Sequence, residues 1–417
     1  MALSSSASGV ATTGTGAPSG HRPSRGLLPL LLAGNTAMYA LYVGVPGLLL
    51  ALQIEDIDPA NKVANFGLVA GVSAIFATVF NPVAGALSDR SGRRNPWILA
   101  GGLLAVPVMF LLGSAHTILL VLIAWCLGQA VMNVYQAAIT SVVPDRVPVA
   151  ARGKASAAVG LGLPIGSTIG ALVGAAFSEN YRTGYLVFGV IVAATAVLFT
   201  TCAREERMPA KAPLPVRQQL AAFGSALRDH DFRWAFIGRA LLVLGYFAVA
   251  GFQLYILKDH IELPAGLSPE EAVAILMPLN SVAMVISTIL GGWLSDRYDR
   301  RKLFVGASAA LAAVALVIPA VSSSWTAMLV FSAVNGLGFG CYMAVDTALV
   351  TMVLPKAEDA ARDMGVLNVA NAGPQIVAPF VASLIVSLSG GYTALFLIAA
   401  VLSIFGALAV RPIRSVR

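Results

Sequence analysis

The sequence carries little charge. Only 11% of its 417 residues are Asp, Glu, Lys or Arg, whereas 58% are hydrophobic and the mean hydropathy is +0.81. Soluble proteins carry about 25% charged residues, so a soluble protein is excluded. The short alternating segments of an outer-membrane barrel are also missing. The long apolar runs, each able to cross the roughly 30 Å hydrocarbon core as a helix, indicate an all-α membrane protein.

Residues for covalent or metal chemistry are also scarce. Cys126, Cys202 and Cys341 stand singly, which excludes a disulfide framework and a zinc site. No Walker sequence is present, so we expect no cofactor and no direct use of ATP. The glycine patterns at 160–166 and 336–340 lie inside apolar spans and predict close helix packing. No nucleophile–base set is visible within the spans, and the longest polar stretch is too short for a receptor domain, so an enzyme and a receptor are both disfavoured.

The apolar runs predict twelve transmembrane helices in two six-helix bundles. The bundles occupy 27–203 and 233–410. We expect a disordered cytoplasmic tail at 1–26, which lacks the order of a signal peptide, a cytoplasmic linker at 204–232 and a cytoplasmic tail at 411–417. The predicted spans are 27–52, 63–87, 96–113, 117–143, 155–177, 184–203, 233–257, 271–294, 302–320, 325–354, 364–388 and 391–410.

The basic residues predict the orientation. If both termini are cytoplasmic, every Lys and Arg faces the cytoplasm except Lys62, Arg182 and Lys258 outside and Arg239 within a helix. This asymmetry follows the positive-inside rule, and it predicts a multi-pass protein of the cell membrane. The basic loops face anionic lipid, which accounts for the net charge of +7 without nucleic acid as a partner.

The chain repeats itself at about half its length. Gly85-Ala-Leu-Ser-Asp89-Arg90 returns as Gly292-Trp-Leu-Ser-Asp296-Arg297, and a basic cluster follows each copy. Gln136 corresponds to Asp346, and Gly34-Asn35 corresponds to Gly238-Arg239. Two related halves are suited to alternating access, in which they rock about a site near the middle of the membrane.

The segment G-x-L-S-D-R-x-G-R-R resembles the signature between the second and third helices of the major facilitator superfamily. Asn81-Pro82, Arg93-Arg94-Asn-Pro96-Trp97 and Pro144-Asp145-Arg-Val-Pro148 resemble the sucrose/proton symporter-like branch and its bacterial relatives. The resemblance implies that the signature latches the two halves on the cytoplasmic side, with Asp89 and Arg90 taking part. A pure role in topology and folding is the alternative. The predicted gate motif comprises Gly85, Asp89, Arg90, Gly92, Arg93, Arg94, Asp296 and Arg297, with Gly85 allowing close backbone packing.

Asp346 is the only one of the 20 acidic residues well inside a span, and Arg239 is the only intramembrane base. A lone charge at this depth costs about 2.5–3.5 kcal/mol even on the lenient insertion scale. The resemblance places their two helices at the central cavity, and both residues lie at similar depth. We therefore expect an ion pair that proton uptake breaks; a permanent salt bridge that fixes packing is the alternative.

Amides and tyrosines at helical spacing predict a substrate surface. They supply donors and acceptors to a hydroxylated ligand, although amides also join helices to one another. As a set they favour a neutral polar ligand. The candidates are Asn35, Tyr39, Tyr42, Gln129, Asn133, Gln136, Tyr246, Asn368, Asn371 and Gln375, with Gln253 beside Tyr246 on its helix.

The sequence thus predicts a secondary active transporter driven by a proton gradient. The expected partners are a small sugar-like solute, protons and membrane lipids, and a monomer is expected. Proton-antiport efflux of a drug or natural product is the alternative, because import and export use the same helices.

Overall fold

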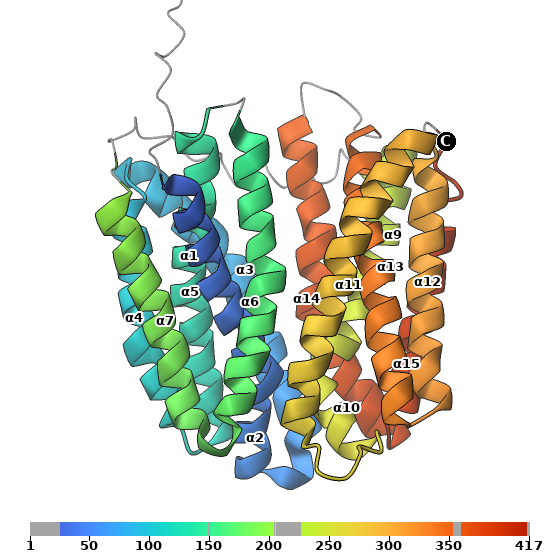
Figure 1. Ribbon diagram of the computed structural model, residues 1–417, viewed down its shortest axis with the longest axis horizontal. Helices are drawn as coiled ribbons and strands as arrows, with labels where there is room; N and C mark the ends of the chain where they lie inside the picture. Colours follow the sequence, from blue (N-terminus) through green and yellow to red (C-terminus); the bar gives the residue numbers. More distant parts are fainter. Residues whose placement is uncertain (1–25, 149–150, 204, 206–226, 353–359, 415–417) are drawn as a thin grey trace, which may run out of the picture.

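The computed structural model describes residues 26–148, 151–203, 205, 227–352 and 360–414, without the side chains of 351, 360–365 and 368. The regular secondary structure of the described part is helical, and one isolated bridge joins Glu262 and Ser324 (Figure 1). The N-terminal half contains α1 (Leu27–Gly44), η1 (Val45–Leu49), α2 (Leu50–Ile57), α3 (Lys62–Ser91), α4 (Asn95–Gly113), α5 (Ile118–Arg146), α6 (Arg152–Ala176) and α7 (Tyr181–Cys202). The C-terminal half contains α9 (His230–Ala250), α10 (Gln253–Asp259), α11 (Pro269–Tyr298), α12 (Arg301–Val321), α13 (Trp325–Met352), α14 (Ala360–Ser389) and α15 (Thr393–Leu408).

The prediction of twelve membrane helices is confirmed. In the described part of the chain, 11 spans are long and apolar enough to cross a membrane, and α15, with 16 residues, is the shorter twelfth. Two spans differ from the prediction. The first runs on to Ile57 through the π-helical turn at Val45–Leu49, where Pro46 has no N–H to donate. The seventh is broken after Ala250 and resumes as α10 at Gln253.

The two signature copies end their helices in the same way. Gly92 after α3 has φ 64°, and Asp299 after α11 has φ 50°, so both adopt the left-handed conformation that ends many helices. Glycine adopts it without a Cβ clash, and Asp is among the few other residue types found there. The loss of glycine in the second copy is therefore compatible with the same turn.

Small residues let neighbouring helices approach closely. A Cβ added at Gly162 would lie 2.7 Å from Asn35 Cβ, and one at Gly166 would lie 2.6 Å from the carbonyl oxygen of Thr36, so α6 packs directly on α1. Gly336 on α13 is similarly close to the carbonyl oxygen of Asn280 on α11. This confirms the packing role of both glycine patterns. Gly85 differs from the prediction, because an added Cβ there would have no neighbour within 4 Å.

The two halves meet at one end of the molecule. α6 packs against α11 and α3 against α14, and the Ser167 and Ser281 hydroxyls lie 3.0 Å apart across the contact. We call the end that carries Asp58–Lys62 and Asp259–Ser268 the closed end. The opposite end, which carries both signature copies and the described chain ends Gly26 and Arg414, is the motif end (Figure 1).

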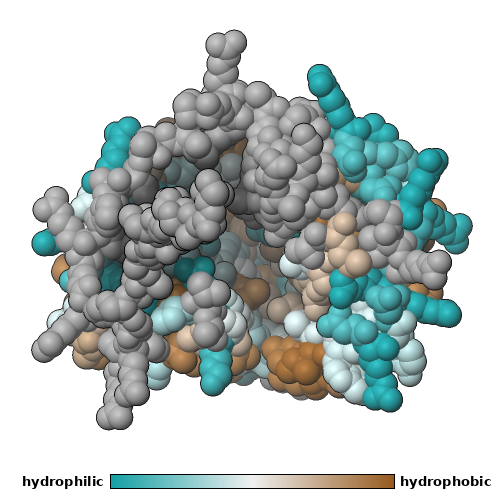
Figure 2. All heavy atoms as spheres, turned by 90° about the horizontal axis from the view of Figure 1, so that it is seen from above, coloured by the Kyte–Doolittle hydropathy of each residue, from teal (hydrophilic) through white to brown (hydrophobic). Residues whose placement is uncertain are grey.

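The halves separate toward the motif end. Among the described residues, no hydrogen bond or ion pair joins the halves there. Figure 2 looks onto this end and shows hydrophilic residues around its rim, with a recess between the halves. The tails predicted at 1–26 and 411–417 and the linker at 204–232 lie largely outside the described residues, so these assignments remain predictions.

Candidate functional site

The structure brings Arg239 and Asp346 together inside the C-terminal half. Arg239 Nε donates to Asp346 Oδ2 at 2.6 Å, and Nη2 lies 2.5 Å from the same oxygen. The two residues are 6% and 2% exposed. Arg239 Nη2 also lies 3.4 Å from the hydroxyl of Thr347. A buried ion pair of this kind is strongly destabilised when one partner loses its charge, because the other charge then stays unpaired.

The corresponding positions of the N-terminal half are neutral. Gln136, the counterpart of Asp346, accepts a 3.3 Å hydrogen bond from the Tyr42 hydroxyl. Asn35, the counterpart of Arg239, is fully buried against α6 and donates to the Leu31 carbonyl oxygen, while its own Oδ1 has no partner among the described residues. Asn35 therefore lies within a helix contact and not on the substrate surface predicted for it.

The amides of α5 join helices as well as lining a face. Asn133 is buried, accepts a 3.0 Å hydrogen bond from Asn81 on α3 and donates to the carbonyl oxygen of Gln129. The side chain of Gln129 is partly exposed and makes no hydrogen bond within the described residues, as is true of Tyr39 on α1. Asn133 thus joins α5 to α3, as the alternative interpretation of these amides expects. Gln129 and Tyr39 instead have side-chain polar atoms that make no hydrogen bond within the described residues.

On α14, Asn371 and Gln375 are partly exposed, and Gln375 donates to the carbonyl oxygen of Asn371 at 3.1 Å. The third member of this predicted set, Asn368, has its side chain outside the described residues. The face of α14 therefore presents at least these two polar side chains one turn apart.

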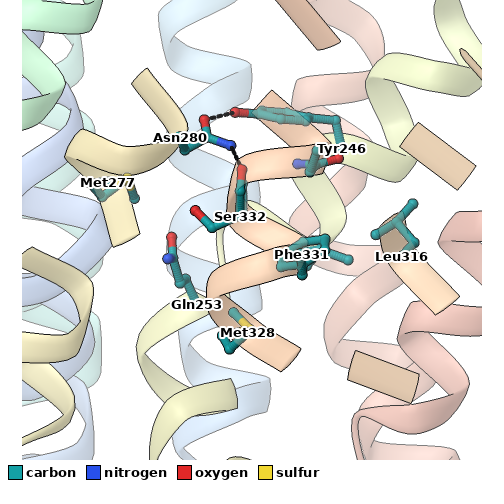
Figure 3. A pocket seen from close by; sticks show the side chains of 11 residues that line it. Tyr246, Gln253, Met277, Asn280, Leu316, Met328, Phe331 and Ser332 are labelled. Carbon is teal, nitrogen blue, oxygen red and sulfur yellow. Dashed lines mark hydrogen bonds between the residues drawn. The ribbon is translucent and has the colours of Figure 1, made fainter. Parts of the chain in front are cut away.

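Tyr246 belongs to a cavity that sequence reasoning found only in part. It stacks on Phe339 with ring centroids 3.8 Å apart, and its hydroxyl lies 3.4 Å from Asn280 Oδ1 (Figure 3). Gln253 lines the same cavity, together with Asn335. Sequence reasoning missed Asn280 and Asn335 because each is a lone amide within an apolar span, with no other amide at helical spacing. The signal in the sequence was that each is the only amide in an otherwise apolar stretch.

The signature residues of the first copy form a cluster within the N-terminal half. Arg94 is buried, pairs with Asp89, and donates through Nε to Asp145 at 2.8 Å. Glu205 accepts from the backbone N–H of Asn95 at 3.1 Å, and Arg146 reaches Glu205 at 2.6 Å. The cluster ties the ends of α3, α4, α5 and α7 together.

The predicted latch between the halves is not formed in this conformation. Asp89 bonds within its own half, and Arg90 and Arg93 are exposed. In the second copy, Asp296 pairs with Arg301 at 3.0 Å, and Arg297 lies over the Trp293 ring at 5.2 Å. Because the halves are apart at the motif end, the signature residues make no hydrogen bond or ion pair with the other half among the described residues.

Sequence reasoning missed a charged latch at the closed end. Lys258 on α10 bonds Glu55 on α2 at 2.8 Å, and Lys62 on α3 bonds Asp259 on α10 at 2.8 Å, so two ion pairs cross between the halves. The Tyr255 hydroxyl adds a 2.8 Å bond to the carbonyl oxygen of Ala51. Burial alone would lower the pKa of Lys258, but hydrogen bonds and charges of Glu55 and Glu270 raise its pKa above the ordinary value. Lys258 therefore stays charged at neutral pH.

The described residues hold no group of three or more His, Cys, Asp or Glu side chains that could bind a metal ion.

The sequence model of the Major Facilitator Superfamily matches residues 30–269 and 256–416. The chain belongs to the major facilitator superfamily. It is therefore a multi-pass membrane transporter and not an enzyme.

Relatives within the superfamily include transporters named for efflux and resistance. The MFS transporter asaE of Aspergillus flavus is 23% identical over 340 residues, which cover 78% of this chain and 72% of that protein. The class C tetracycline resistance protein of Escherichia coli is 25% identical over 211 residues, 49% of this chain and 50% of that protein. The multi-drug resistance efflux pump PmrA of Streptococcus pneumoniae is 28% identical over 178 residues, 38% of this chain and 42% of that protein. The matches to these last two thus span half or less of their length.

Solved structures of major facilitator transporters share the fold. The nucleoside transporter NupG has a TM-score of 0.77 at 16% identity, with 92% of this chain and 98% of that chain covered. An inward-facing, occupied bacterial homologue of the human lysosomal transporter Spinster has a TM-score of 0.73 at 16% identity, with 94% and 97% covered. The family match shows the superfamily, and the sucrose/proton symporter-like branch suggested by the sequence is not confirmed.

Proposed function

We propose that this protein is a proton-coupled secondary transporter of the cell membrane that moves a small uncharged polar solute by alternating access. The observation that carries the proposal is the buried pair of Arg239 and Asp346. When Asp346 takes up a proton, Arg239 keeps a buried charge without a counter-ion. That state is disfavoured by kilocalories per mole, so protonation favours any conformation that gives Arg239 water or a new partner.

The arrangement of the halves supports alternating access. If the termini are cytoplasmic, as the basic loops predict, the closed end faces outward and the halves are apart on the cytoplasmic side. The charged latch at the closed end then acts as the outer gate.

Export by proton antiport is a second candidate. The class C tetracycline resistance protein and PmrA carry resistance and efflux in their names, which favours outward movement of an organic molecule. The neutral amides along α5 and α14 favour an uncharged polar solute in either direction. Import of a sugar-like solute remains the first candidate for the cargo because those amides can bond hydroxyl groups.

Flux in proteoliposomes tests the coupling. A thermal-shift screen of sugars, glycosides and antibiotics supplies the labelled solute, and imposed pH gradients of either sign show the direction of transport. Asp346→Asn is expected to abolish pH-driven accumulation and to retain exchange of solute down its own gradient.

The matched control is Glu262→Gln, which neutralises an exposed acid in the α10–α11 loop and should accumulate solute as the wild type does. Normal accumulation by Asp346→Asn would refute the coupling role. Equal accumulation with and without a pH gradient in the wild type would refute proton coupling altogether.

A further inference from the structure

The cavity in the C-terminal half has no charged residue in its wall. α9, α11 and α13 enclose it, with Gln253 of α10 and Leu316 of α12 completing the lining. The volume open to the centre of a water molecule is about 50 Å³, and one water requires roughly 10–15 Å³ measured in this way. The cavity therefore has room for a few waters or for one small group of a larger molecule.

Two amides line this cavity without a hydrogen bond to any described part of the protein. Asn335 is only 8% exposed, and Gln253 is half-buried at the first position of α10. Asn280 differs, because it accepts from Tyr246 and donates to the carbonyl oxygen of Ser332 at 3.0 Å. In Figure 3 the Gln253 side chain points toward Ser332 with no bond drawn to it. Their polar atoms are not sealed inside the protein but face the open cavity, so these two amides can bond a partner from outside the protein.

Part of the cavity wall is apolar. Met277 of α11 and Met328 and Phe331 of α13 face the same space. Methionine adapts its shape to different partners. A charged group placed here would lack a counter-ion, so its burial would be unfavourable. The cavity thus selects for an uncharged group next to a carbon skeleton.

The cavity also lies at the break between α9 and α10. Residues 251 and 252 separate the two helices, and Gln253 starts α10. Discontinuous helices surround the substrate sites of many transporters. α10 continues into Tyr255 and Lys258 of the charged latch. A ligand held by Gln253 therefore contacts the same short helix that closes the outer end.

We infer that this cavity is a subsite that binds an uncharged hydrogen-bonding group of the solute, a hydroxyl or carboxamide, with the adjoining apolar part of the solute against Met277, Met328 and Phe331. The inference rests on the proposed transport function and names the class of solute as neutral and amphipathic. Gln253 and Asn335 supply the donors and acceptors.

Equilibrium binding to the purified full chain in lipid nanodiscs tests this subsite. The probe is radiolabelled phenyl β-D-glucoside, with D-glucose and tetraphenylphosphonium as competitors. The glucoside is expected to bind, glucose to compete more weakly, and the cation not to compete. Gln253→Leu and Asn335→Leu should each weaken binding by about two- to twelvefold, the effect of one neutral hydrogen bond.

Thr200→Val is the matched control, because its hydroxyl bonds back to its own helix at the Ala196 carbonyl oxygen, far from the cavity in sequence and fold. It should bind the glucoside as the wild type does. Asn335→Leu should unfold at the wild-type temperature or above, since the amide it removes makes no hydrogen bond within the described residues. A fall in that temperature with Asn335→Leu would show a structural partner and overturn the inference.

Two binding results would also overturn it. One is glucoside binding that both leucine variants leave unchanged, which would mean that the cavity holds water only. The other is absence of glucoside binding, or equal competition by the cation. No proton gradient enters this measurement. Glucoside binding without pH-driven flux would therefore refute the proposed coupling and leave the subsite standing. pH-driven flux together with unchanged glucoside binding by the leucine variants would refute the subsite and leave the coupling standing.

Discussion

Neutralising Glu55 should open the closed end. Its carboxylate bonds Lys258 across the halves at 2.8 Å and Lys62 within its own half at 2.9 Å. An exposed pair contributes about 0.2–1 kcal/mol and a hydrogen bond to a charged group about 1.5–3 kcal/mol. Because these side chains are partly buried, we expect Glu55→Gln to shift the equilibrium toward opening by about 1–2 kcal/mol, a factor of roughly 5–30 in population.

Cysteine alkylation measures this shift. Ser167→Cys, in a background without Cys126, Cys202 and Cys341, places a thiol in the contact between α6 and α11. A membrane-impermeant reagent added from the closed end reacts only when the halves part there. Its rate should therefore rise by about the same factor of 5–30 in the Glu55→Gln variant.

The matched control is Glu270→Gln. Glu270 bonds the same Lys258 at 3.1 Å, but both residues belong to the C-terminal half. Its alkylation rate should stay within about twofold of the parent, since this ion pair lies within one half and does not have to break when the halves part. If Glu55→Gln left the rate unchanged, or if Glu270→Gln raised it equally, the ion pairs between the halves would not hold the gate shut.

Two further predictions concern stability in detergent, measured by thermal unfolding. Arg239→Leu leaves Asp346 buried without its counter-ion and should destabilise the protein by about 3–5 kcal/mol. The double variant Arg239→Leu with Asp346→Leu should recover most of this loss. A double variant no more stable than either single variant would contradict a net penalty from the unpaired charge. Gly92→Ala places a Cβ at φ 64° and should destabilise by about 1–2 kcal/mol. Its control, Gly85→Ala in the same signature, should be neutral or slightly stabilising because nothing lies within 4 Å of the added atom; equal effects at both glycines would contradict the role of the left-handed turn.

The sequence predicted the features that follow from local pattern. Twelve apolar runs and the glycine contacts of α6 and α13 depend on neighbouring residues and on membrane thickness. The meeting of Arg239 and Asp346 was also predictable, because each is the single charge of its sign inside the spans and neither can stay there alone.

Features that depend on pairing between distant helices were not predictable. Glu55, Lys62, Lys258 and Asp259 look like ordinary charges at helix ends, and only the contact between the halves makes them a latch. Asn35 has the spacing of a cavity residue, yet the glycines of α6 bring a second helix directly against it. Spacing identifies a face, but it does not say whether water, solute or another helix covers that face.

The shortness of α15 bears on how the bilayer acts on the two halves. With 16 residues it spans about 24 Å, whereas its counterpart α7, with 22 residues, spans about 33 Å. The hydrocarbon core is about 30 Å thick, so one half matches the membrane and the other is too short at this helix. Beside α15 the lipid thins locally, or Arg411 reaches up to the headgroups. A change in the acyl-chain length of the lipid therefore strains the C-terminal half at α15 more than the N-terminal half at α7.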